Sequence, residues 1–114
     1  MKYITLVAFL FSLSFISCSD DDNNGDDLPT CINDIRNDFR QDACEGSGDL
    51  TIWRLRGQDV YCFNIGNCVS DGSADIYDTN CNLICTLGGI AGNGVCDGVD
   101  WNTSAEFIEL IEVF

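Results

Sequence analysis

The sequence has no histidine, and its only lysine is Lys2. Catalytic nucleophiles that depend on histidine or lysine are therefore excluded from the rest of the chain, and so is a Schiff base. No two cysteines have the Cys-x-x-Cys spacing of thioredoxin-type redox sites, the closest pair being Cys81 and Cys85. Most hydrolase and thiol-redox mechanisms are thus excluded, and we expect no cofactor.

Positive charge is scarce in this chain. Its 114 residues include five lysines and arginines against nineteen aspartates and glutamates, which gives a formal net charge of -14. Such a surface repels phosphate backbones and anionic lipid headgroups. We therefore expect no nucleic acid among its partners, and cationic partners fit this charge better.

The sequence also lacks an apolar run long enough for a transmembrane helix, which needs about 20 residues. The apolar run at 3–16 is shorter, follows Lys2 and precedes an acidic cluster. A basic residue followed by a short apolar run is typical of an export signal. We therefore expect a lipoprotein signal peptide at residues 1–17.

The end of this run contains a lipidation motif. Phe15, Ile16, Ser17 and Cys18 resemble the lipobox of bacterial lipoproteins, in which an apolar and a small residue precede an acylated cysteine. The resemblance implies that Cys18 becomes the lipidated N-terminus and anchors the chain in a bacterial membrane, where several acyl chains give stable attachment. The alternative is that Cys18 is an ordinary disulfide cysteine.

A polar segment follows the motif. Residues 19–27 include five aspartates, two asparagines and a glycine, a composition that buries little apolar area and stays disordered. We expect residues 18–30 to form the lipidated cysteine and an acidic, disordered tether. An acidic run directly after the lipidated cysteine also resembles the surface-export signal of Bacteroidota lipoproteins. That resemblance implies a cell-envelope protein of the outer membrane that faces the outside.

Cysteine is abundant, with eight residues in the chain. We expect residues 31–114 to form a single domain, and exported domains with so small a core are commonly held together by disulfides. With Cys18 assigned to lipid, seven cysteines remain. At most three disulfides then form, and one thiol is left over.

Cys85 and Cys96 are the preferred disulfide pair, because their bond closes a glycine-rich loop and contributes about 3 kcal/mol through chain entropy. Cys31 and Cys44 are excluded as partners of each other if a helix separates them, since its ends lie about 20 Å apart. We expect further disulfides to involve three cysteines whose pairing stays open, namely Cys44, Cys68 and Cys81.

The apolar pattern predicts an α+β fold. Ile32, Ile35 and Phe39 have helical spacing, which predicts a short helix over 31–42 with Thr30 as its N-cap. Period-two alternation predicts a first hairpin over 50–65. We expect a second hairpin formed by residues 75–77 and 83–86. A helical turn is expected after Ser104, and a last strand from Leu110. We thus expect a short N-terminal helix packed on a small antiparallel sheet of two hairpins plus a C-terminal strand, stapled by disulfides.

The first hairpin allows a prediction of register. Gly57 and Gln58 suit a type II′ turn, which sets Arg56 opposite Asp59. The same register sets Leu55 opposite Val60 and Trp53 opposite Cys62. These last four residues share one face of the hairpin, and we expect that face to meet the helix.

The sequence contains no established metal-binding motif. Asp97 and Asp100 are weak candidates for a loose calcium site, and the alternative is a solvated acidic loop. Asp78, Asn80 and Asn82 are spaced like the first ligands of a calcium-binding EF-hand loop. Leu83 stands where such a loop requires glycine, so an EF-hand is excluded.

Four motifs follow one another along the domain, at residues 57–61, 66–68, 77–82 and 88–94, and the last contains four glycines around Ile90. Together they resemble an uncharacterised family, a domain of unknown function, of small exported Bacteroidota lipoproteins with a GGIxGNG-like loop. The resemblance covers most of residues 31–114. It implies no activity.

These observations predict a membrane-anchored, surface-exposed lipoprotein. Its domain is expected to be a non-enzymatic binding or envelope-associated module with an unknown protein or glycan partner. Two alternatives stay open. One is a protease-inhibitor-like module that presents the loop 85–96, and the other is a carboxylate-dependent glycan-active enzyme, because the many acidic residues offer many pairs.

Overall fold

The structure, a computed structural model, describes residues 27–114. The expected signal peptide, Cys18 and most of the expected tether lie outside the described residues. The described part contains a five-stranded antiparallel sheet in the order β4-β3-β2-β1-β7, a two-stranded sheet of β5 and β6, and two helices. In chain order the elements are α1 (Thr30–Phe39), β1 (Asp49–Leu55), β2 (Gln58–Asn64), β3 (Ser73–Tyr77), β4 (Leu83–Gly88), β5 (Val95–Cys96), β6 (Val99–Asp100), α2 (Trp101–Ser104) and β7 (Ala105–Val113).

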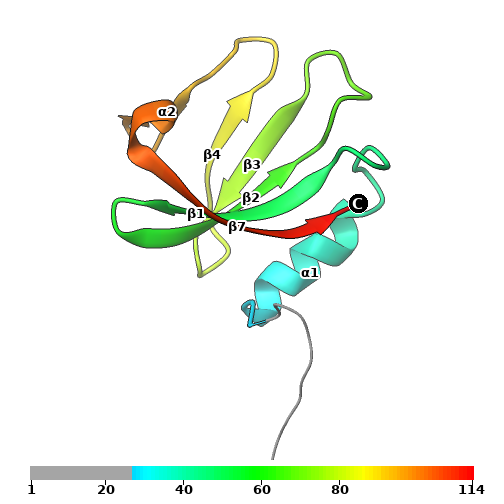
Figure 1. The fold of residues 1–114 in the computed structure, drawn as a ribbon, viewed down its shortest axis with the longest axis horizontal. Helices are drawn as coiled ribbons and strands as arrows, with labels where there is room; N and C mark the ends of the chain where they lie inside the picture. The colour runs from blue at the N-terminus through cyan, green and yellow to red at the C-terminus, as the bar shows by residue number, and fades with distance from the viewer. Residues whose placement is uncertain (1–26) are drawn as a thin grey trace, which may run out of the picture.

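This arrangement confirms the predicted α+β fold. β1 and β2 form the first hairpin, β3 and β4 form the second, and the C-terminal β7 pairs with β1. Figure 1 shows α1 below the sheet and α2 on the opposite side, with β7 running from α2 toward α1. The sheet therefore carries other elements on both of its faces.

Helix α1 starts one residue earlier and ends three residues earlier than predicted. Thr30, expected as the N-cap, is the first helical residue, and Pro29 takes the cap position without a side-chain hydrogen bond. The carbonyl of Pro29 accepts a hydrogen bond from the backbone N–H of Ile32, so the proline begins the helix through its backbone. The helix ends where the carbonyl of Phe39 accepts a hydrogen bond from the N–H of Asp42, which tightens the last turn.

The turn of the first hairpin differs from the predicted one. Its central residues are Arg56 and Gly57, with φ of 55° and 79°, and two positive angles define a type I′ turn rather than type II′. The register therefore moves by two residues, and Arg54 instead of Arg56 lies opposite Asp59. Because side chains alternate with period two, every side chain keeps its predicted face. The other pairs move in the same way, Leu55 to Gln58, Trp53 to Val60 and Thr51 to Cys62.

The face of the sheet that meets α1 is the opposite of the predicted one. Ile32 of α1 packs with Leu50, Tyr61 and Phe63, and all four are buried. The ring of Phe39 meets that of Phe63 edge to face, with centroids 5.2 Å apart. Both faces of the hairpin are apolar near its middle, so the alternation of apolar residues does not by itself choose the face that a helix covers.

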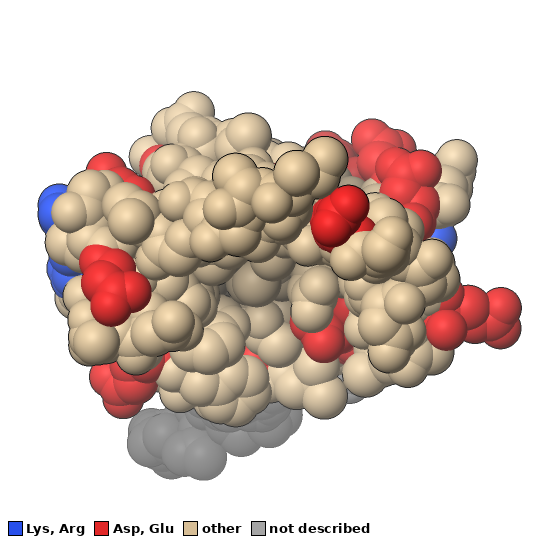
Figure 2. Space-filling view, turned by 90° about the horizontal axis from the view of Figure 1, so that it is seen from above, with Lys and Arg blue, Asp and Glu red and all other residues tan. Residues whose placement is uncertain are grey.

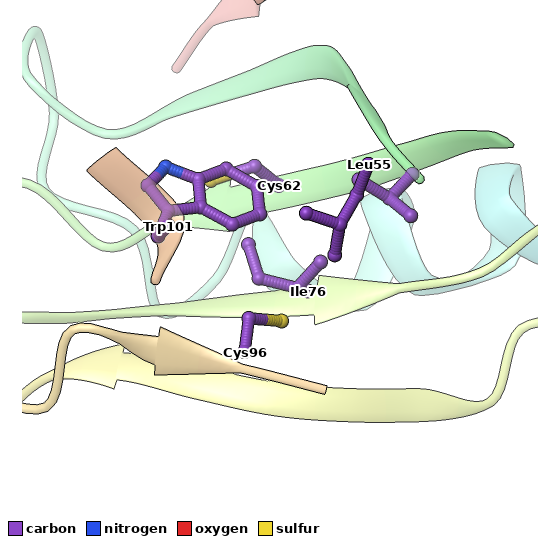
Figure 3. Close-up of a cluster of buried hydrophobic side chains, with 6 residues drawn as sticks. Leu55, Cys62, Ile76, Cys96 and Trp101 are labelled. Atoms are coloured by element: carbon purple, nitrogen blue, oxygen red, sulfur yellow. The ribbon is translucent and has the colours of Figure 1, made fainter. Parts of the chain in front are cut away.

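The face that was predicted to contact the helix is covered instead by the glycine-rich segment and the residues that follow it. Leu55, Val60, Cys62 and Ile76 form a buried cluster with Cys96 and Trp101. Figure 3 shows Trp101 beside Cys62 and Ile76, with Cys96 approaching from β5. The glycine-rich segment is thus partly regular, because β5 and β6 form a small hairpin around Asp97 and Gly98.

The C-terminal strand is longer than predicted, and it explains the glutamates that recur at every third position. The helical turn ends at Ser104 instead of following it, and β7 begins at Ala105 rather than near Leu110. Its pairing with β1 shifts twice, which leaves Ile108 and Ile111 without a partner in β1. Each β-bulge adds one residue to the period of two. Two side-chain series of spacing three result, an acidic one (Glu106, Glu109 and Glu112) on the α1 side and an apolar one (Phe107, Leu110 and Val113) on the other.

Three disulfides connect these layers. They join Cys31 to Cys81, Cys44 to Cys68, and Cys85 to Cys96. The third is the pair preferred from the sequence. The first ties α1 to the turn between β3 and β4, so it fixes the helix against the far hairpin. The Cα atoms of this pair are 6.1 Å apart.

Glu112 attaches the end of β7 to α1. Its carboxylate accepts hydrogen bonds from Nε of Arg36 at 2.7 Å and from Nη2 of Arg40 at 2.7 Å. Burial opposes its charge, but the hydrogen bonds and positive charges of Arg40 and Arg36 outweigh burial and lower the pKa of Glu112. A lowered pKa means that this contribution to stability is complete above the ordinary value of 4.5 and is lost as pH falls through the folded-state value.

We therefore expect Glu112→Gln to lower the free energy of unfolding at pH 7 by about 1 kcal/mol. The difference from the wild type should shrink as pH falls below 4.5 and through the folded-state pKa of Glu112. Urea unfolding at pH 7 and pH 3 measures both values. Glu109→Gln, on the same face but without an arginine partner, is the control and should change neither. A Glu112→Gln deficit as large at pH 3 as at pH 7 would contradict this role.

Candidate binding surfaces

The described residues carry fifteen acidic residues and four arginines. All four arginines form ion pairs, and they use three carboxylates, those of Asp59, Asp97 and Glu112. Twelve carboxylates of this part of the chain are left without an arginine partner. Figure 2 shows the face opposite α1 as largely uncharged, with acidic residues around its rim. The domain therefore presents apolar and anionic surface, and little free positive charge.

The two weak calcium candidates do not form a ligand cluster. Asp97 occupies the turn between β5 and β6, and its carboxylate lies 3.6 Å from Nη1 of Arg56. The carboxylate of Asp100 accepts a hydrogen bond from the hydroxyl of Thr103 at 3.3 Å. Across residues 27–114, no group of three or more His, Cys, Asp or Glu side chains is placed to hold a metal ion.

The unpaired thiol among the described cysteines is that of Cys62, which is buried on β2. Burial raises the pKa of Cys62 to about 11, and a hydrogen bond involving Thr51 only partly offsets this. Thiolate, not thiol, is the nucleophile. Cys62 therefore acts as an apolar core residue, and sequence reasoning did not single it out because its spacing does not differ from that of a bonded cysteine.

We expect Cys62 in the folded protein to resist alkylation at pH 8. With a pKa of about 11, roughly one molecule in a thousand is ionised at that pH, and the side chain is also inaccessible. Iodoacetamide followed by intact-protein mass spectrometry should show no adduct in buffer and one adduct in guanidinium. Rapid labelling in buffer would show that the thiol is accessible.

A cleft of about 370 Å³ lies between the turns of three hairpins, β1–β2, β3–β4 and β5–β6. Leu55, Val60 and Ile84 line it together with Asp78 and Asp97. Backbone N–H groups of Asn82 and Asn80 donate to Asp78 and lower its pKa. A general acid for glycoside hydrolysis needs a raised pKa, so Asp78 does not suit that role.

A second hollow, of about 310 Å³, lies on the α1 side beside β7. Three carboxylates line it, those of Asp27, Asp59 and Glu109. Tyr61 lies among them, and burial followed by the charge of Asp59 raises the pKa of its hydroxyl. Asp59 is paired with Arg54 at 3.1 Å, so Asp27 and Glu109 are the carboxylates that favour a cationic group in this hollow.

The two edges of the five-stranded sheet differ. At the β4 edge, the disulfide of Cys85 and Cys96 holds the following segment against the strand, and Gly88 forms a bridge with Asn93. At the β7 edge, no other described strand pairs with β7. Three apolar side chains of β7 are about half exposed, Phe107 at 51%, Leu110 at 52% and Val113 at 52%. An open edge beside exposed apolar side chains is a surface on which another chain can pair.

The loop 85–96 presents Ile90, which is 88% exposed. Its tip is a turn in which the N–H of Gly92 donates to the carbonyl of Gly89. The side chain of Asn93 fixes the base of the loop by donating to the carbonyls of Thr86 and Val95. The tip is thus a compact turn rather than an extended strand, which does not favour the protease-inhibitor alternative.

Sequence reasoning missed β7 as a candidate surface. The spacing of three between its glutamates fits neither a helix nor a regular strand, and two bulges are needed to interpret it. The sequence signal is the pair of interleaved series, Glu106 with Glu109 and Phe107 with Leu110. An acidic and an apolar series of equal spacing indicate opposite faces of one twice-bulged strand.

Comparison with known proteins gives a family but no activity. Within residues 27–114, neither helix is long and apolar enough to cross a membrane. No curated protein and no solved structure matches the chain. The model of a domain of unknown function, DUF6970, matches residues 37–112, which include the whole five-stranded sheet apart from the last residue of β7. The chain therefore belongs to the DUF6970 family.

Proposed function

We propose that this protein is a lipid-anchored, non-enzymatic binding module displayed on the outer face of the outer membrane. The lipobox-like sequence ending at Cys18 and the acidic run after it support the anchor and its orientation. The resemblance to small exported Bacteroidota lipoproteins supports the same placement. Three disulfides suit a domain that works in an oxidising compartment.

The open edge of β7 carries the binding part of the proposal. Asp78 in the larger cleft has a lowered pKa, and the free thiol of the described residues is buried, which favours recognition over catalysis at these surfaces. β7 combines unpaired backbone groups with exposed Phe107 and Leu110. Strand addition at such an edge is a common way for small domains to bind proteins.

The experiment is capture of an envelope or secreted protein by the lipidated protein in detergent. Leu110→Lys places a charge on the β7 edge and should abolish capture. Leu83→Lys on β4 is the matched control, because Leu83 is 54% exposed on the other edge strand. Capture that survives Leu110→Lys would reject β7 as the binding edge. Turnover of a glycan that is lost on an Asp→Asn change would contradict the binding function itself.

A further inference from the structure

We propose that the β7 edge binds an extended segment of a partner protein in which basic and apolar side chains alternate. This inference rests on the proposed binding function and names the chemistry of the partner. The segment would add as a sixth strand next to β7. Its apolar side chains would lie beside Phe107 and Leu110, and its basic side chains beside Glu106 and Glu109.

The backbone of β7 provides the first part of the argument. β7 extends over Ala105–Val113 and pairs along one side with β1. Its other side has no strand partner among the described residues, so its outward N–H and C=O groups are free to pair with an added strand. The bulges at Ile108 and Ile111 bend β7. A short extended segment follows a bent edge better than a long flat strand does.

The side chains provide the second part. Residues of an added strand alternate between the two faces of the sheet. On the α1 face they meet the exposed Glu106 and Glu109, and Glu109 also lines a hollow with Asp27. Arg54 of β1 lies opposite Glu106, but its guanidinium pairs with Asp59 at 3.1 Å. On the other face they meet Phe107, whose ring packs against that of Trp53 with centroids 5.4 Å apart. One face thus selects positive charge and the other selects apolar contact.

The same charges exclude two other occupants. A second copy that pairs antiparallel through β7 would bring its own Glu106 and Glu109 to the same side of a continuous sheet. Like charges on neighbouring strands are destabilising, and each described domain carries fifteen acidic residues against four arginines. The acidic segment 19–27 of the chain would bring five aspartates to the same edge. A cationic strand is therefore the occupant that this edge fits.

The test uses the lipidated protein in detergent and a fluorescent peptide of about eight residues in which lysine and valine alternate. Fluorescence anisotropy gives the Kd, and hydrogen exchange locates the site. We expect saturable binding, slower amide exchange in β7, and loss of binding when alternate peptide amides are N-methylated. Replacing both Glu106 and Glu109 with glutamine should raise Kd about tenfold, the combined effect of two exposed charge pairs. Asp34→Asn with Asp71→Asn, which removes the same charge elsewhere on the exposed surface, should leave Kd unchanged.

Three outcomes of these measurements on the peptides and the free protein would overturn the inference. They are equal binding of a peptide with glutamate in place of lysine, equal binding of the N-methylated peptide, and dimerisation of the protein through β7. Capture of a natural partner that Leu110→Lys does not disturb would also reject the β7 edge while leaving a binding function in place. Turnover of a substrate would instead reject the binding function itself.

Discussion

Replacing both Cys31 and Cys81 with alanine is expected to lower the free energy of unfolding by about 4 kcal/mol and the Tm by about 20 °C. The two residues are 50 positions apart, the largest separation among the three disulfides. In the chain-entropy model, a bond across a longer loop removes more freedom from the unfolded chain. A loss of this size is comparable to the whole stability of many small domains.

The other two disulfides provide an internal control. Their separations are 24 for Cys44–Cys68 and 11 for Cys85–Cys96, which correspond to about 3.5 and about 3 kcal/mol. Guanidinium unfolding of the three double-alanine variants should therefore rank them by loop length. If the variant lacking the Cys85–Cys96 bond is the least stable, packing of the second core around Cys96 outweighs chain entropy, and the ranking argument fails.

The first disulfide also shows how far the sequence predicts this fold. The apolar pattern predicted the hairpins and the faces of β1 and β2, because alternation is a local property of a strand. The side of the sheet on which α1 lies is not local. Cys31 and Cys81 hold α1 on the face of Leu50 and Phe63, and this pair could not be chosen before the topology was known.

Turns and bulges account for most of the remaining differences. The sequence predicts Gly57 as the first residue of its turn, but the right-handed twist of the hairpin favours two left-handed residues, so Arg56 adopts φ of 55° despite its Cβ. Asp97 and Gly98 form a similar turn, with φ of 54° and 81°. Asp-Gly is a strong hairpin signal, but the glycine-rich segment around it and its acidic side chains suit a solvated loop equally well. A single residue at each bulge likewise changes the period of a whole strand, as it does in β7.

The candidate surface follows from these nonlocal features. Phe107 and Glu106 are adjacent in sequence, and only the β1–β7 register assigns them to opposite faces. The segment after β4 covers one face of the sheet with Cys96 and Trp101. Leu110 is exposed because this cover does not reach it. The sequence therefore predicted an anionic surface. It also showed that histidine is missing and that lysine occurs only at Lys2, which excludes several catalytic mechanisms. The proposed binding edge could be identified only once the strand order placed β7 at the end of the sheet.

The largest functional effect is expected from Cys18→Ser, which should move nearly all of the protein from the membrane fraction to the soluble fraction of a bacterium that processes lipoproteins. Two or more acyl chains give stable attachment, whereas one chain gives only marginal binding. The acidic domain offers no electrostatic substitute, because its surplus of carboxylates is repelled by anionic headgroups. Membrane fractionation with immunoblotting measures the shift.

Cys62→Ser is the matched control for that experiment. Cys62 lies on β2, between β1 and β3, and its buried thiol is the free one among the described cysteines. Its replacement therefore measures the effect of losing a cysteine that carries no anchor. The protein with Cys62→Ser should stay in the membrane fraction, and mass spectrometry of the wild type should show an acylated N-terminus at Cys18. An intact Met1, or a Cys18→Ser protein that stays in the membrane fraction, would contradict the anchor. The outward display of the β7 edge would then lose its support, because the tether positions the domain only if its first residue is fixed in the bilayer.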